Sequence, residues 1–106
     1  MSPPLLPKPY AATRHFVERA RERGLPRDVE GFVLAWGTEI ESRDDCKYFT
    51  VLRRDLPDGL AWSSLARRAD GWIVVVAENG SLITCYRERH AWRTLKRRRE
   101  DRRHAA

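Results

Sequence analysis

The sequence has little of several features that define whole classes of protein. Only two of its 106 residues are cysteine, Cys46 and Cys85, and they form no Cys-x-x-Cys pair, which excludes a disulfide scaffold and a zinc module. No apolar run approaches the roughly 18 residues that span a bilayer. The first nine residues hold four of the six prolines and do not resemble a signal peptide. We therefore predict no membrane partner and a reducing, cytoplasmic location.

Motifs for common cofactors are also missing. The sequence contains no Walker-type glycine loop, Gly-x-Ser-x-Gly elbow, His-Glu-x-x-His or Asp-x-Asp calcium loop. A metal site built from the cysteines and histidines would need ligands from distant segments. We therefore expect no cofactor and no metal, and interpret Cys46 and Cys85 as small buried hydrophobic residues.

Positive charge is present and is unevenly distributed. The formal net charge is +6, from 21 Lys and Arg against 15 Asp and Glu. Nine of these bases but only three of the acids lie between Arg87 and Arg103, so the rest of the chain is electrically balanced. The whole excess belongs to a C-terminal segment.

Apolar residues recur at helical spacing twice in the first third of the chain. Thr13 suits the N-cap of a first helix, and Gly24 suits its left-handed C-cap. Pro26 fits the first turn of a second helix, which Gly37 ends. The predicted apolar stripes are Ala12, Phe16, Val17 and Ala20 in the first helix and Val29, Phe32, Val33 and Trp36 in the second.

After Gly37 the pattern becomes that of strands. We predict a short edge strand over 38–42, a polar turn over 43–45 and a longer strand over 46–53. The segment 60–69 fits either a helix or a strand.

The strongest local signal is a hairpin near the end of the chain. Two β-branched runs, 72–77 and 81–87, flank Asn79 and Gly80, the preferred pair for a two-residue type I′ turn. In that register Val75 lies opposite Thr84, Ile73 opposite Tyr86, and Glu78 opposite Ser81.

This order of elements predicts an α+β fold: two N-terminal helices packed on a twisted antiparallel sheet of about four strands, with a basic C-terminal helix. The chain divides into an extended proline-rich tail over 1–12, the α+β domain over 13–87, and the C-terminal helix and tail over 88–106. Ala91, Trp92 and Leu95 form the stripe by which this helix docks.

Chemistry-bearing side chains are few. His15 and Arg19 lie four apart on the flank of the first helix, where a partly exposed histidine is the simpler interpretation. Thr84 and Tyr86 point to one face of the last strand, with Cys85 and Arg87 on the other. Threonine and tyrosine are also ordinary strand formers, so spacing alone favours a structural role for both.

The basic C-terminal segment is the clearest indication of a partner. Clustered Lys and Arg bind polyanions by releasing counterions, so nucleic acid is the first candidate, and an acidic protein would be attracted by the same field. The residues we assign to nucleic-acid binding are Arg19, Arg53, Arg54, Arg89, Arg93, Lys96, Arg97, Arg98 and Arg99.

Three segments together form a pattern similar to a known group. They are a first helix that opens with His15 and closes with Glu22-Arg23-Gly24-Leu25, a second helix around Val29, and a final hairpin from Asn79 to Arg87. The pattern resembles small bacterial domains of unknown function that are grouped with the RelE and BrnT toxins. These belong to the superfamily of metal-independent ribonucleases that includes barnase, EndoU and the colicins. The resemblance covers roughly residues 13–87.

The resemblance implies a four-stranded sheet whose concave face holds RNA, a metal-independent endoribonuclease of toxin type, and an antitoxin partner. It implies that His15, Thr84, Tyr86 and Arg87 form the catalytic set and that cleavage proceeds through the 2′-hydroxyl. His15 would be the acid or base, and Arg87, Arg53 or Arg19 would neutralise the phosphate. The residues alone leave open a non-catalytic module that binds nucleic acid or protein through its C-terminal helix.

Overall fold

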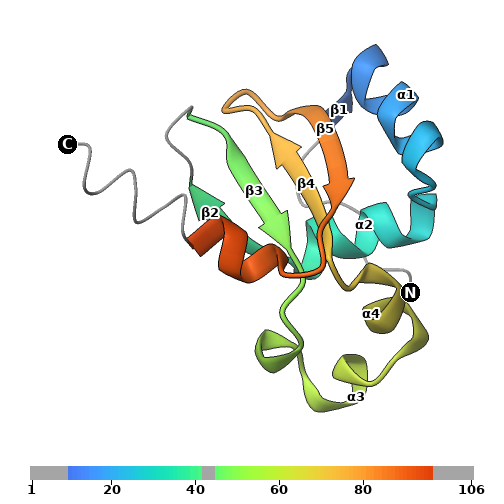
Figure 1. Cartoon of the computed structure of the whole chain (residues 1–106), viewed down its shortest axis with the longest axis vertical. Coiled ribbons are helices and arrows are strands. Elements are labelled where there is room, and N and C mark those ends of the chain that lie inside the picture. The colour runs from blue at the N-terminus through green and yellow to red at the C-terminus, as the bar shows by residue number, and fades with distance from the viewer. Residues whose placement is uncertain (1–9, 42–44, 97–106) are drawn as a thin grey trace.

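A five-stranded sheet forms the centre of the computed structural model, which describes residues 10–41 and 45–96 (Figure 1). The strands are β1 (Ala11–Ala12), β2 (Thr38–Glu41), β3 (Lys47–Thr50), β4 (Trp72–Val76) and β5 (Ser81–Arg87). Their order is β1-β5-β4-β3-β2, with β1 parallel to β5 and the other neighbours antiparallel. The α+β class is therefore confirmed. The expectation of about four antiparallel strands is corrected by the short parallel strand β1, which lies inside the predicted tail.

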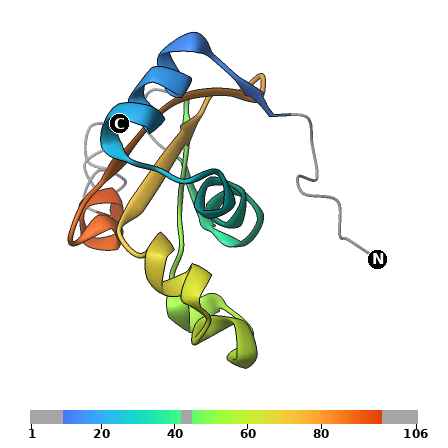
Figure 2. The ribbon, with the colours of Figure 1, turned by 90° about the vertical axis from the view of Figure 1, so that its right-hand side faces the viewer.

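The two N-terminal helices are α1 (Arg14–Arg23) and α2 (Arg27–Trp36). Thr13 caps α1: its hydroxyl accepts a hydrogen bond from the Phe16 N–H at 3.1 Å and donates one to the Leu82 carbonyl at 2.7 Å. Gly24 ends α1 in the left-handed conformation, with φ at 74°, as predicted. Figure 2 shows the sheet nearly edge-on, with α2 on one face and α1 beyond the edge of β5.

Three residues of the predicted helical stripes are solvent-exposed, and one of them, Ala12, lies in β1 ahead of α1. Val17 is 44% exposed and Trp36 is 47% exposed, so their assignment to the core was wrong. In α1 only Phe16 is buried, because this helix lies beside a strand edge and contacts the sheet along a narrow strip. Helical spacing identifies one side of a helix, but the width of the buried strip depends on what the helix packs against.

The segment between β3 and β4 is helical. It contains a 3-10 turn, η1 (Arg53–Asp55), and the short helices α3 (Asp58–Ala61) and α4 (Ser64–Ala69). The strand predicted over 46–53 is therefore shorter, and Arg53 and Arg54 lie on η1 instead of at a strand end. The insert packs on α2, where Arg68 contacts Asp28 at 2.6 Å and holds the pKa of that carboxyl below its ordinary value.

Each face of the sheet carries its own hydrophobic core. On the first face, α1, α2 and the helical insert cover residues that include Phe49, Val74 and Cys85. On the second face, Ile73 and Val75 pack under Ala91 and Leu95, which belong to a helix over 91–96. The docking stripe of the C-terminal helix is thus confirmed, with Trp92 half-buried. Arg97, Arg98 and Arg99 lie outside the described residues.

The β4–β5 hairpin differs from the predicted type I′ turn. A type I′ turn needs positive φ at Asn79, but Asp45 is the only non-glycine with positive φ within 10–41 and 45–96. The Gly80 N–H instead donates to the Ala77 carbonyl at 2.9 Å, and the Ala77 N–H donates to the Ser81 carbonyl at 2.8 Å. The loop is therefore longer by one residue, and the predicted pairing of Glu78 with Ser81 is wrong.

No helix in the described ranges is long and apolar enough to cross a membrane.

Candidate functional site

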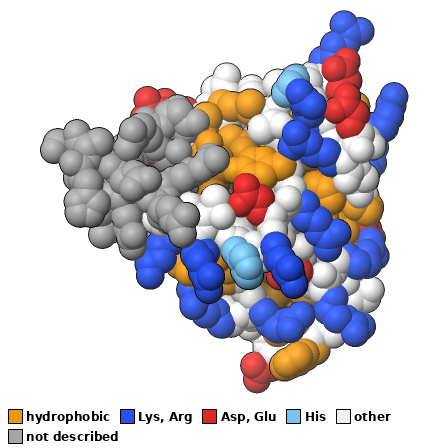
Figure 3. All heavy atoms as spheres, in the orientation of Figure 1, with side chains coloured by type: hydrophobic (Ala, Val, Ile, Leu, Met, Phe, Trp, Pro, Cys, Tyr) orange, Lys and Arg blue, Asp and Glu red, His pale blue; other side chains and the backbone are white. Residues whose placement is uncertain are grey.

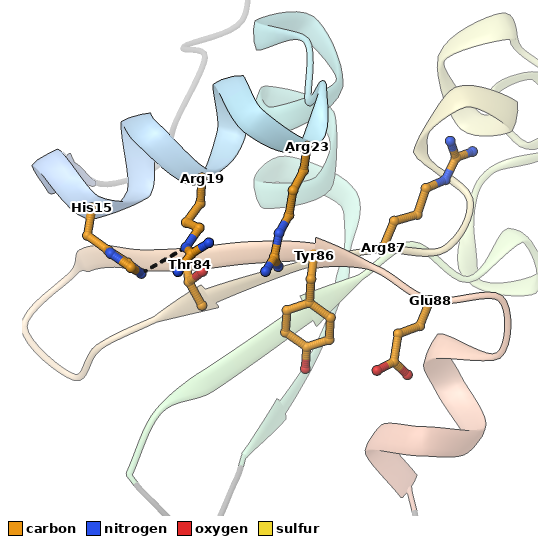
Figure 4. A pocket seen from close by; sticks show the side chains of 7 residues that line it. All are labelled: His15, Arg19, Arg23, Thr84, Tyr86, Arg87 and Glu88. Carbon is orange, nitrogen blue, oxygen red and sulfur yellow. Dashed lines mark hydrogen bonds between the residues drawn. The ribbon is translucent and has the colours of Figure 1, made fainter.

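An open pocket lies where α1 runs beside β5. It has a volume of about 750 Å³, and the residues that line it come from α1, from β5 and from the turn that follows β5. They are His15, Arg19, Arg23, Thr84, Tyr86, Arg87 and Glu88 (Figure 4). The structure thus brings together the four residues predicted to be catalytic, together with one of those predicted to bind nucleic acid.

The contribution of α1 follows from its spacing. His15, Arg19 and Arg23 are four residues apart, which places them on one face of the helix at successive turns. Figure 4 shows that all three side chains extend from α1 toward β5. The Arg19 Nε donates to the His15 Nε2 at 3.5 Å, and the Arg19 guanidinium contacts the Glu22 carboxylate at 3.1 Å. The outcome is a row of cationic and imidazole groups along one side of the pocket.

A β-bulge determines which side chains β5 presents to the pocket. Val75 pairs with Thr84, as predicted, but Val76 pairs with Leu82, so Ile83 has no partner on β4. Leu82 therefore packs in the first core, and Ile83 packs against the second. Strict alternation would have put Leu82 and Thr84 on the same face. The bulge lets Leu82 fill the core while Thr84 lines the pocket beside Tyr86, and bulges commonly redirect side chains in this way.

Two of the three pocket arginines are held by backbone carbonyls. The Arg23 Nη1 donates to the Cys85 carbonyl at 2.7 Å, and the Arg87 Nε donates to the Asp70 carbonyl at 3.2 Å. The Arg87 guanidinium also lies 5.7 Å from the centre of the Trp72 ring, a stabilising cation–π distance. Each contact uses one N–H group of a five-donor fork, so each arginine keeps donors for an anion while the contact restricts the motion of its side chain.

Sequence reasoning missed two pocket residues, Arg23 and Glu88. The four-residue step from His15 to Arg19 continues to Arg23, and this periodicity could have identified it. Glu88 lies past the end of β5, and its N–H donates to the Gly71 carbonyl at 2.8 Å. This tertiary contact brings Glu88 to the pocket, so no local sequence pattern could have identified it. With three arginines against one carboxylate, the lining is strongly cationic.

The other described residues among those predicted to bind nucleic acid lie outside the pocket lining. Arg53 and Arg54 stack on Trp62 and Trp92, each with its guanidinium carbon 5.1 Å from the ring centre. The three remaining described residues, at or near the C-terminal helix, are exposed: Arg89, Arg93 and Lys96. The described members of the predicted set therefore fall on two regions, the pocket and the surface formed by η1 and the C-terminal helix.

Cys85 lies between Thr84 and Tyr86 in β5, and its side chain belongs to the first core, where burial raises the pKa of its thiol. A thiol held in the neutral form is a poor nucleophile, so the buried structural role predicted for Cys85 is confirmed. Cys46 is half-buried. Within 10–41 and 45–96, His, Cys, Asp and Glu form no group that could hold a metal ion.

Gly71 positions the Glu88 end of the pocket, and replacing it with alanine should destabilise the fold. Gly71 has φ at 83°, and a Cβ there would lie 2.8 Å from the Glu88 carbonyl oxygen. We expect Gly71→Ala to lower the free energy of unfolding by about 1–3 kcal/mol in urea denaturation. Gly31→Ala is the control: it lies within α2 with open space around it, and should raise stability by up to about 1 kcal/mol. Equal stabilities of the two variants would contradict this role of Gly71.

A scan against protein-family models finds no matching family, and searches of curated proteins and of solved structures find no match.

Proposed function

We propose that this protein binds single-stranded RNA in the pocket between α1 and β5 and cleaves it as a metal-independent endoribonuclease. One observation carries the proposal: three arginines, a histidine, a threonine and a tyrosine from α1, β5 and its C-terminal end line one open pocket. Guanidinium groups match phosphate oxygens in charge and geometry. A histidine beside them adds an imidazole, which can accept or donate a proton.

The chemistry needs only groups of the substrate, groups of the pocket and water. His15 takes the proton of the RNA 2′-hydroxyl, and the 2′ oxygen attacks the adjacent phosphorus. The bond from phosphorus to the 5′ oxygen breaks, and that oxygen leaves with a proton from water. The products are a 2′,3′-cyclic phosphate and a 5′-hydroxyl. Arg19, Arg23 and Arg87 neutralise the crowded phosphate, and the Thr84 hydroxyl can donate a hydrogen bond to its oxygens.

The resemblance to RelE- and BrnT-type toxins supports the same proposal. It rests on a first helix that opens with His15 and closes with Glu22 to Leu25, and on the hairpin from Asn79 to Arg87. These two segments contain every residue of the pocket lining except Glu88. An antitoxin or another acidic protein partner follows from the resemblance as part of this proposal. Such a partner would act by covering the cationic lining of the pocket.

The test is an incubation of the purified protein with single-stranded RNA in EDTA. The expected products carry 2′,3′-cyclic phosphate ends, and a strand of the same sequence made of DNA should remain intact because it lacks the nucleophile. An RNA with one 2′-deoxy nucleotide should be cut everywhere except after that position. RNA that stays intact, although the protein binds it, would contradict the catalytic part of the proposal.

A non-catalytic nucleic-acid-binding module is the second candidate, and the exposed cations of the C-terminal helix favour it. Arg89 and Arg93 are exposed, and Trp92 beside them is contacted by Arg54. Truncation before this helix is an unsuitable test, because Leu95 belongs to the second core. The suitable test is the double substitution Arg89→Gln and Arg93→Gln: it should abolish binding if the helix carries the function, and leave cleavage largely intact if the pocket does.

A further inference from the structure

The helical insert between β3 and β4 exposes a tryptophan that the fold does not bury. Trp62 follows α3 directly and is 72% exposed, more than any other large hydrophobic residue of the described ranges. Tryptophan is usually well buried, so the exposure of Trp62 leaves a large apolar side chain in solvent. The Arg53 guanidinium carbon lies 5.1 Å from the ring centre, which gives one side of the indole a cationic neighbour.

The backbone around Trp62 is fixed on both sides. Ala61 and Ala66 are buried in the first core. Between them, the Ser63 hydroxyl donates to the Leu60 carbonyl at 2.7 Å and accepts the Ala66 N–H at 3.1 Å, which caps α4. The backbone that carries the indole is therefore held in place between α3 and α4. Because this segment is already ordered, stacking of a ligand on the indole carries little entropic cost for ordering the protein.

The insert adjoins the Arg87 end of the pocket. Arg87 and Glu88 bond to the carbonyls of Asp70 and Gly71, which follow α4. In Figure 4 Arg87 points away from Tyr86. The six residues of α4 span about 9 Å, so Trp62 lies about one helix length from this end. At about 3.4 Å for each stacked nucleotide, a strand covers that length with about three nucleotides.

The surface near the insert has the charge that a nucleic-acid strand requires. Figure 3 shows Lys and Arg side chains around α1, around the insert and around the C-terminal helix, with hydrophobic side chains in the middle of this face. Arg53 and Arg54 follow one another on η1, and each contacts a tryptophan, Trp62 and Trp92 respectively. Alternation of guanidinium groups and aromatic rings is typical of surfaces that bind single strands, where bases stack and phosphates pair with the cations.

We propose that Trp62 stacks on an unpaired nucleobase of the RNA strand held in the pocket, with Arg53 pairing with the neighbouring phosphate. This inference rests on the proposed function, since it places a second contact on the same strand. Arg53 lies over the indole ring, and a base adds to the stack on the opposite face. The insert thus makes the protein sense strand length: a dinucleotide fills only the pocket, and a longer strand reaches Trp62.

The test compares Trp62→Ala with Trp36→Ala, a matched control at the end of α2 that also removes an exposed tryptophan. The probes are single-stranded 2′-deoxy oligonucleotides of two and eight nucleotides, which cannot be cleaved through a 2′-hydroxyl. Trp62→Ala should weaken binding of the eightmer about tenfold and leave dinucleotide binding unchanged, because one base stack is lost. Trp62→Phe should restore most of the affinity, and Trp36→Ala should bind both probes like the wild type.

Two results would overturn this inference and are distinguishable from each other. If the wild type binds the eightmer and Trp62→Ala binds it equally well, the stacking site is wrong while the pocket stands, and Trp62 is left for a protein partner. If the wild type binds neither probe, the proposed function itself fails together with this inference. Trp62 and Trp36 are both exposed. Trp62→Ala and Trp36→Ala should therefore unfold at the same urea concentration as the wild type.

Discussion

Replacing His15 with alanine should lower the rate of RNA cleavage by about 10²–10⁴-fold, the usual contribution of a general acid or base. The substitution removes the proton acceptor for the 2′-hydroxyl but leaves all three pocket arginines. Binding of an uncleavable 2′-deoxy strand should therefore change little. The measurement is the initial cleavage rate of a single-stranded RNA in EDTA, alongside the affinity for the matching DNA strand.

His90→Ala is the matched control for this experiment. His90 is exposed and is absent from the pocket lining, so its removal should leave the cleavage rate within about twofold of the wild type. A His15→Ala protein that cleaves at the wild-type rate would remove His15 from the mechanism. Equal losses in both variants would indicate a general effect on the folded protein and not a role specific to His15.

Replacing Leu95 with alanine should lower the free energy of unfolding by about 2–5 kcal/mol, which is the cost of a cavity at a buried leucine. Leu95 is 1% exposed and packs with Ile73 and Val75 on the second face of the sheet. A domain of this size has about 5–15 kcal/mol of stability in total, so the loss should be visible as a large shift in urea denaturation.

Lys96→Ala is the control on the same helix. Lys96 is exposed, and its removal should change stability by less than about 0.5 kcal/mol. A small effect of both substitutions would contradict the docking of the C-terminal helix. The basic segment would then be an appendage, and the second face of the sheet would be an exposed apolar surface.

Local signals in the sequence were sufficient for the helices and for part of the hairpin. Thr13 and Gly24 delimit α1 because capping depends on the side-chain hydroxyl and on tolerance of positive φ, both of which are local properties. The pairing of Val75 with Thr84 was also predicted, although the predicted turn was wrong. The longer loop and the bulge compensate for one another, so the register recovers beyond Ile83.

Tertiary contacts determine what the sequence could not reveal. Ala11 and Ala12 carry no strand pattern, and they form β1 only because β5 offers a free edge. Val17 is exposed because α1 lies at that edge. In the site, the four-residue step predicted His15 and Arg19 on one face. Glu88, by contrast, reaches the pocket through a contact with Gly71, some 17 residues earlier in the chain.

The central claim is that phosphates bind in the pocket between α1 and β5, and the salt dependence of binding tests it most directly. The affinity of a 2′-deoxy oligonucleotide should be measured from low to high salt for the wild type and for the double variant Arg19→Met and Arg23→Met. The control, Arg14→Met with Arg21→Met, removes the same charge from exposed positions of α1 outside the lining. We expect the pocket variant to reduce the slope of log affinity against log salt by about 1.4, or about 0.7 for each lost phosphate contact. The control should retain the wild-type slope. Identical slopes in the pocket variant and the wild type would contradict the claim.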